Sequence, residues 1–70
     1  MFIINEYQTT GDSTAIVTPA KESNYDNAQS VFFSRCASAA ISKVSIHTVN
    51  LMDERGVVYD NRVFLHGVEE

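Results

Sequence analysis

Residues 42–66, SKVSIHTVNLMDERGVVYDNRVFLH, have the pattern of one antiparallel hairpin and decide the fold. Apolar and β-branched residues are frequent on both sides of Asp53-Glu54-Arg55-Gly56, which has the composition of a turn. Two such runs around a short turn that ends in glycine are a strong hairpin signal. Asp53 suits the first turn position, and Gly56 provides the positive φ with which a type I turn closes into a β-bulge. The sequence therefore predicts strands at about 43–52 and 57–66.

The chain before this hairpin predicts a second hairpin followed by one helix. Strands are expected at about 2–8 and 14–18, with Pro19 ending the second of them. A helix is expected over about 24–41, because apolar residues recur there every three or four positions. Ser23 and Asp26 have the spacing of a capping box at its start.

The order of these elements predicts an α+β fold, ββαββ, that forms a single domain over residues 1–70. It is a four-stranded antiparallel sheet with one helix packed on one face, and residues 67–70 are expected to be a short acidic tail. Because one helix covers only one face, the other face must be polar, bind something, or pair with another copy.

A chain of 70 residues with one cysteine has few means of stabilisation beyond its core. A domain of this length buries only about 60% of the surface that its unfolded chain exposes, and small domains often depend on disulfides, metals or partner subunits. Cys36 has no second cysteine to pair with, and His47 and His66 lack the spacing of a metal site. We therefore expect a homo-oligomer without cofactor or metal.

The formal charge of −4 limits the classes of partner. An acidic balance argues against general binding to nucleic acid or to anionic membranes, since both need a basic surface. The segment Met1-Phe2-Ile3-Ile4 lacks the basic residues of a signal peptide, and no apolar run approaches the roughly 18 residues of a membrane span. The sequence favours a soluble, intracellular protein.

The register of the second hairpin carries the functional prediction. With Met52 opposite Val57, the pairs Ile46/Val63 and Val44/Leu65 form an aliphatic face, which we expect beneath the helix. The opposite, uncovered face then carries the pairs His47/Arg62, Ser45/Phe64 and Lys43/His66.

Four of the seven Lys, Arg and His residues would thus gather around Phe64 on the uncovered face. Opposed side chains lie about 4.5–5.5 Å apart, and like charges at that distance are unfavourable unless they share an anion. Arginine offers a planar fork for phosphate, and phenylalanine a surface for stacking a base. The predicted ligand-binding residues are Lys43, His47, Arg62, Phe64 and His66, with Arg35 from the helix. The alternative is a solvated face with neutral histidines, whose cations pair with Asp60, Glu69 or Glu70.

No catalytic constellation is recognisable in the sequence. Ser, His and Asp occur without the spacing of a known triad, and the three glycines are scattered rather than gathered into a phosphate loop. Cys36 lies in the middle of the predicted helix on its apolar face, which is typical of a packed cysteine rather than a nucleophile. We do not expect an enzyme.

Two stretches of the chain carry a resemblance to known proteins: Ala39-Ala40-Ile41-Ser42-Lys43-Val44-Ser45-Ile46-His47, and Leu51-Met52 with Gly56-Val57-Val58. They resemble a group of small phage and prophage proteins of Gram-positive gut bacteria. The shared features are an Ala-rich helix end, Ser-Lys-Val-x-x-His and Leu-Met-x-x-x-Gly-x-Val, over residues 24–66. In that group a Tyr or Cys commonly precedes the last His, whereas this chain has Leu65 before His66.

The resemblance implies a host-takeover factor in the cytoplasm of the host cell. The first expectation is a non-catalytic oligomer that sequesters a small anionic ligand, such as a nucleotide signal of host defence. The second is a protein–protein interaction module: an inhibitor of a host protein, an adaptor or a minor virion component. A third is a small enzyme whose residues meet across a subunit interface.

Overall fold

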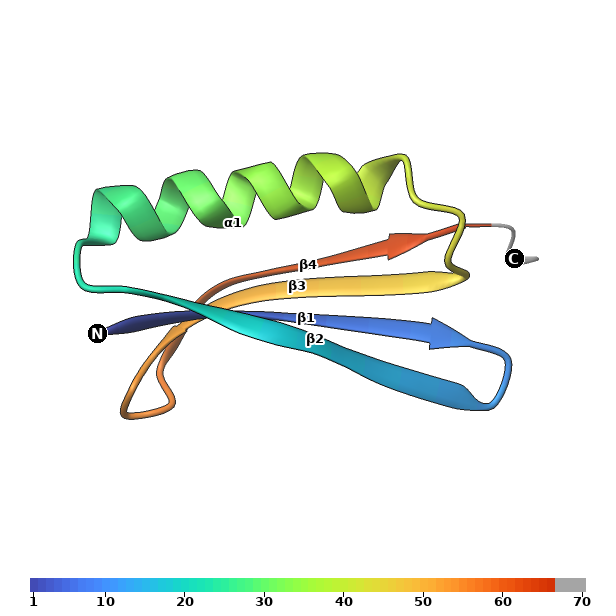
Figure 1. Ribbon diagram of the computed structural model, residues 1–70, viewed down its shortest axis with the longest axis horizontal. Coiled ribbons are helices and arrows are strands. Elements are labelled where there is room, and N and C mark those ends of the chain that lie inside the picture. The colour runs from blue at the N-terminus through green and yellow to red at the C-terminus, as the bar shows by residue number, and fades with distance from the viewer. Residues whose placement is uncertain (67–70) are drawn as a thin grey trace.

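A computed structural model describes residues 1–66 as one antiparallel sheet with a helix against one face, which confirms the predicted α+β fold (Figure 1). The elements in chain order are β1 (Phe2–Thr10), β2 (Ser13–Glu22), α1 (Tyr25–Ala40), β3 (Ile46–Asp53) and β4 (Val58–Leu65). The expected acidic tail, residues 67–70, lies outside the described residues.

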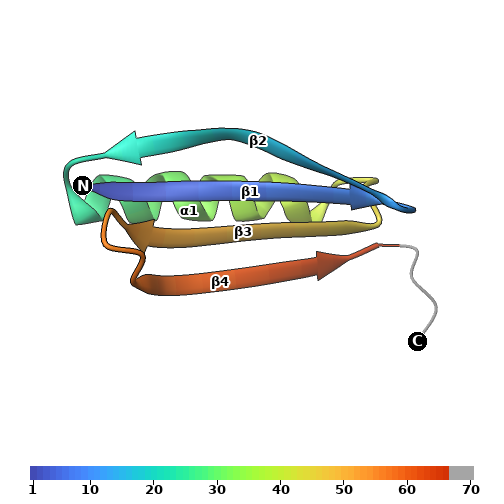
Figure 2. The ribbon, with the colours of Figure 1, turned by 90° about the horizontal axis from the view of Figure 1, so that it is seen from below.

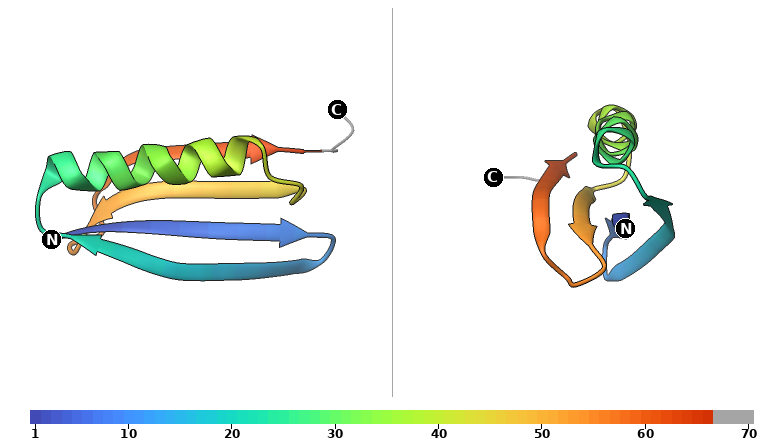
Figure 3. Two further views of the ribbon diagram at one scale, coloured as in Figure 1. Left: turned by 45° about the horizontal axis from the view of Figure 1, so that its top comes forward. Right: turned by 90° about the vertical axis from the view of Figure 1, so that its left-hand side faces the viewer.

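The four strands are ordered β2-β1-β3-β4, and every neighbouring pair is antiparallel. β1 and β3 therefore form the centre of the sheet, and β2 and β4 are its edges, as seen from below in Figure 2. The sheet is twisted, and α1 lies on one side of it only (Figure 3). One face is thus covered by the helix, and the other has no covering layer among residues 1–66.

The turn between β3 and β4 has the predicted construction. Gly56 has φ +89°, in the region that favours glycine. Its N–H donates to the Asp53 carbonyl at 3.0 Å, and the Asp53 N–H donates to the carbonyl of Val57 at 3.0 Å. The prediction of a hairpin around this turn is confirmed.

Two local predictions were wrong. Asn24, not Ser23, caps α1: its side-chain oxygen accepts from the backbone N–H groups of Asp26 at 2.7 Å and Asn27 at 3.2 Å. Pro19 does not end the second strand, because β2 continues to Glu22. Pro19 lies where the register of β2 against β1 shifts, and on an edge strand its missing N–H costs no ladder hydrogen bond.

The core lies between α1 and the two central strands. The largest fully buried side chains are Phe32 from the helix, Ile4 from β1, and Val49 and Leu51 from β3. Each such side chain contributes about 1.5–3 kcal/mol when it leaves water. The buried residues of the helix, Ala28, Phe32, Cys36 and Ala39, recur at the predicted spacing of three or four positions.

The predicted orientation of the second hairpin was also wrong. Phe64, not Arg62, lies opposite His47, a displacement of two residues along β4 that leaves residues 60–65 on the same sheet face as their expected companions, whereas the irregularity between Leu51 and Met52 moves Val58 to the other face, opposite Met52. However, this face is the one beneath the helix: His47, Val49 and Leu51 are buried there. The aliphatic set with Ile46 and Val63 lies on the uncovered side.

Candidate functional site

The residues predicted to bind a ligand are divided between the helix-covered side of the sheet and a loop. His47, Arg62 and Phe64 share the covered face, with Phe64 packed against the core. Lys43 is exposed in the segment between α1 and β3. The six residues therefore do not line an open sheet face, and no pocket is present within residues 1–66.

Three of these residues have hydrogen-bond partners on other elements of the fold, and Arg62 pairs with Asp60 on its own strand. The guanidinium of Arg35 donates to Oε1 of Glu6 at 3.1 Å, and Nε2 of His47 donates to Oε2 of the same carboxylate. His66 Nε2 lies 2.7 Å from the carbonyl oxygen of Ala39, so it donates to the last turn of α1, where free carbonyls need a partner.

Glu6, Arg35 and His47 form a buried polar cluster between the helix and the central strands. His47 is 3% exposed and Glu6 9% exposed, whereas Arg35 is partly open to solvent. Charges out of water persist only when they are paired, so each member depends on the others. Nδ1 of His47 is buried without a hydrogen-bond partner within the described chain. Removing one member of this cluster would leave another without its partner in the core.

Sequence reasoning missed Glu6, although a signal was present. Phe2, Ile4 and Glu6 alternate along β1, so they share one face, and the first two of them are apolar. An acidic residue in line with a core face indicates a partner of opposite charge on a neighbouring element, which here is Arg35.

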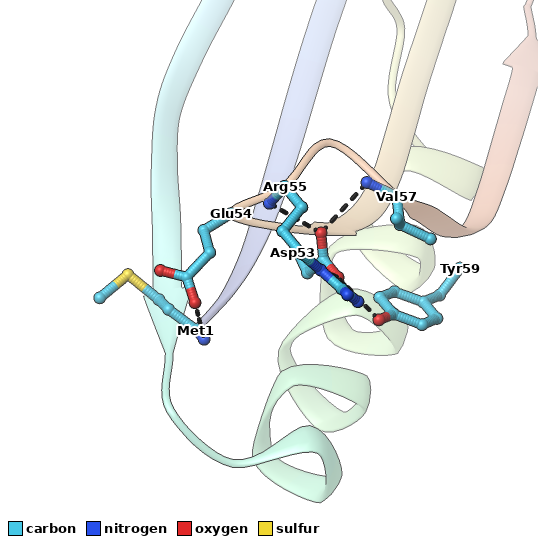
Figure 4. A network of polar contacts seen from close by, with 6 residues as sticks. All are labelled: Met1, Asp53, Glu54, Arg55, Val57 and Tyr59. Carbon is cyan, nitrogen blue, oxygen red and sulfur yellow. Dashed lines mark hydrogen bonds and ion pairs between the residues drawn. The ribbon is translucent and has the colours of Figure 1, made fainter.

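A second polar cluster fixes the turn at the other end of the hairpin (Figure 4). The Asp53 carboxylate accepts from the Arg55 guanidinium at 2.8 Å, from the Tyr59 hydroxyl at 2.9 Å and from the N–H groups of Arg55 and Val57. The Arg55 side chain holds the pKa of Asp53 well below its usual range, and the hydrogen bond from Tyr59 adds to this effect. Beside it, the amino group of Met1 pairs with Glu54 at 3.0 Å.

The uncovered side of the sheet, which we call the open face, differs in character. It consists of the residues that alternate with the helix-facing ones: Ile3, Asn5, Tyr7, Thr9, Thr14, Ile16, Lys21, Ile46, Thr48, Asn50, Met52, Val58, Asn61, Val63 and Leu65. It exposes aliphatic side chains on both edge strands, including Ile16 (67% exposed) and Val63 (52% exposed). Among the residues of this face, Lys21 on edge strand β2 alone carries a charge.

A row of asparagines crosses the open face. Asn5 lies opposite Asn50, and Asn50 lies opposite Asn61, so the three side chains follow one another across β1, β3 and β4. Nδ2 of Asn5 donates to Oδ1 of Asn50 at 3.1 Å and also lies 3.0 Å from the sulfur of Met52. Aliphatic residues lie on both sides of this row.

Metal binding and the reactivity of the cysteine can be assessed within residues 1–66. No group of three His, Cys, Asp or Glu side chains within residues 1–66 is arranged to hold a metal ion. Burial raises the pKa of the Cys36 thiol, which disfavours the reactive thiolate. The helix that the structure describes is not long and apolar enough to cross a membrane.

Comparison of the chain with protein-family models, with curated proteins and with solved structures found no match.

Proposed function

We propose that this chain is a protein–protein interaction module that binds through the open face of its sheet. The observation that carries the proposal is the combination of exposed aliphatic side chains with an almost complete lack of charge on that face. The solvated face of an antiparallel sheet is ordinarily polar, and charged residues are depleted at the centre of protein interfaces.

The charged residues of residues 1–66 lie almost entirely outside the open face. The acidic and basic residues of the strands other than Lys21 lie on the covered side, and others occupy the turns, the helix and the loop after it. Asp60 and Arg62, for example, form an ion pair at 3.2 Å on the covered side of β4. The chain has a normal share of charge, and this charge is kept away from one face.

Site-specific photo-cross-linking tests this proposal. A benzophenone amino acid replaces Val63 on the open face or, as the control, Phe33 on the helix, since both side chains are 52% exposed. We expect discrete protein adducts in cells from position 63 and none from position 33. Equal labelling from the two positions would contradict the proposal. If the phage origin suggested by the resemblance holds, the adducts contain a host protein, a virion protein or this chain itself.

Sequestration of a small anionic ligand stays a prediction from the sequence. The cations with exposed side chains in the predicted set are Lys43 and Arg62, so these are the residues to test. A panel of nucleotides is screened by thermal shift against the native chain and against Lys43→Ala and Arg62→Ala variants. A shift that both variants reduce would favour sequestration over the interaction module.

A further inference from the structure

We propose that the partner of the open face is a second copy of this chain, stacked face to face as a two-fold symmetric dimer. This inference rests on the interaction function proposed above and names its partner. Three properties of the face favour a copy of the same chain over a different protein: its lack of charge, its row of amides and its size.

Charge restricts how two copies of an acidic chain can approach. Each copy carries a formal charge of −4, so most pairs of surfaces bring like charges together. The open face avoids this repulsion, because it carries no acidic residue and its one basic residue, Lys21, lies on the edge strand β2. On this sheet surface two copies can meet without bringing acidic side chains face to face.

The asparagine row gives the face a self-complementary centre. A carboxamide has both an acceptor oxygen and two N–H donors, so identical amides related by a two-fold axis donate to one another reciprocally. A two-fold axis in the plane of the interface, along this row, places the row of one copy over the row of the other. Asn50, on a central strand, then lies near the axis, with aliphatic residues above and below it. Buried asparagines select a single register in other assemblies.

The size of the face is sufficient for a small dimer. Strands of eight residues at about 3.3 Å per residue, four of them about 4.8 Å apart, cover about 500 Å². Two such faces give about 1,000 Å², the lower limit for a specific interface. Stacked sheets pack about 10 Å apart, with their strands crossed by about 30°, and this geometry buries Val58, Val63 and Leu65, each of which is about half exposed in one copy.

Sedimentation equilibrium of the full chain over roughly 1–100 µM tests the dimer. We expect the native chain to be dimeric and Val63→Lys to be monomeric with an unchanged far-UV circular dichroism spectrum, since an edge strand tolerates lysine. The control, Phe33→Lys, is expected to remain dimeric, because Phe33 lies on the helix.

Asn50→Asp provides a second variant in case Val63→Lys does not fold. An aspartate at position 50 still accepts the hydrogen bond from Asn5, so the monomer is preserved. In the dimer it brings two carboxylates together, and we expect the dissociation constant of the dimer to rise about tenfold or more. A native chain that is monomeric at every concentration tested would overturn the dimer. A dimer that both variants leave intact would overturn it as well, because it would indicate pairing through the β4 edge instead.

The outcomes separate this inference from the proposed function. A monomeric native chain that still gives adducts with another protein from position 63 overturns the dimer and supports the interaction module. The absence of any adduct from position 63 overturns both.

Discussion

Replacing Glu6 by glutamine is expected to destabilise the fold by about 2–3 kcal/mol. Removing one member of a wholly buried ion pair costs about 3–5 kcal/mol, because the remaining charge has no partner. The loss expected here lies at or below the lower end of that range, because the Arg35 side chain is 26% exposed and can regain water. His47 is buried and cannot. A chain of 70 residues has a total stability of about 4–10 kcal/mol, so this loss is a large part of it.

Urea unfolding followed by circular dichroism at neutral pH measures the effect, and a fall in Tm of about 10–20 °C is expected beside it. Glu54→Gln is the matched control, since it is the same substitution in an exposed ion pair, and we expect it to change stability by less than about 0.5 kcal/mol. A double-mutant cycle between Glu6 and His47 isolates their contact, with an expected coupling of about 1–3 kcal/mol. Equal losses for the two glutamine variants, or no coupling in the cycle, would refute the assignment of a buried cluster.

Three further predictions concern single residues. Gly56→Ala is expected to lower the free energy of unfolding by about 1 kcal/mol in urea, because φ is positive at this position. Gly56→Asn is expected to lower it less, since asparagine tolerates positive φ better than alanine does. An added Cβ meets no neighbour within 4 Å, so equal losses for the two variants would contradict an explanation from the backbone. The lowered pKa of Asp53 stabilises the fold above the usual value of 3.8, and this contribution is lost as the pH falls below it. Asp53→Asn should therefore flatten the acid limb of a plot of stability against pH, and an unchanged limb would exclude this carboxylate as its source. Cys36 is expected to react with a thiol reagent at least about tenfold faster in urea than in the native state, since it is buried and its pKa is raised; similar rates would place it at the surface.

Local signals in the sequence were sufficient for the elements and their order. The turn Asp53-Glu54-Arg55-Gly56 specifies its own conformation through glycine and aspartate, and the periodicity of Ala28, Phe32, Cys36 and Ala39 specifies the buried face of α1. Errors at the element ends have local causes. Asn24 competes with Ser23 as the cap, and both residue types are good caps, so the pattern alone does not choose between them.

The orientation of the second hairpin was not predictable from the same signals. The set with Ile46, Met52 and Val63 is the more aliphatic, and ordinary patterning places it in the core. The helix instead covers the set with His47 and Arg62, because Glu6 from β1, itself paired with Arg35 from α1, supplies the partner that makes His47 tolerable there. These partners lie far away in the sequence, so the local pattern of residues 42–66 does not contain them.

This unexpected orientation of the second hairpin connects the fold to the proposed function. The sheet has enough apolar residues for two packed layers, with Ile4, Val49 and Leu51 on one face and Ile46, Val58 and Val63 on the other, but the described chain supplies one helix. Covering the more polar face with that helix is costly unless its buried polar groups have partners, and Glu6 pairs with both Arg35 and His47. The arrangement leaves the aliphatic face available, with Lys21 at its edge as the one charged residue. In an isolated monomer this choice exposes the face that is better suited to burial, whereas in a face-to-face dimer both faces are buried and the charges remain outside the interface.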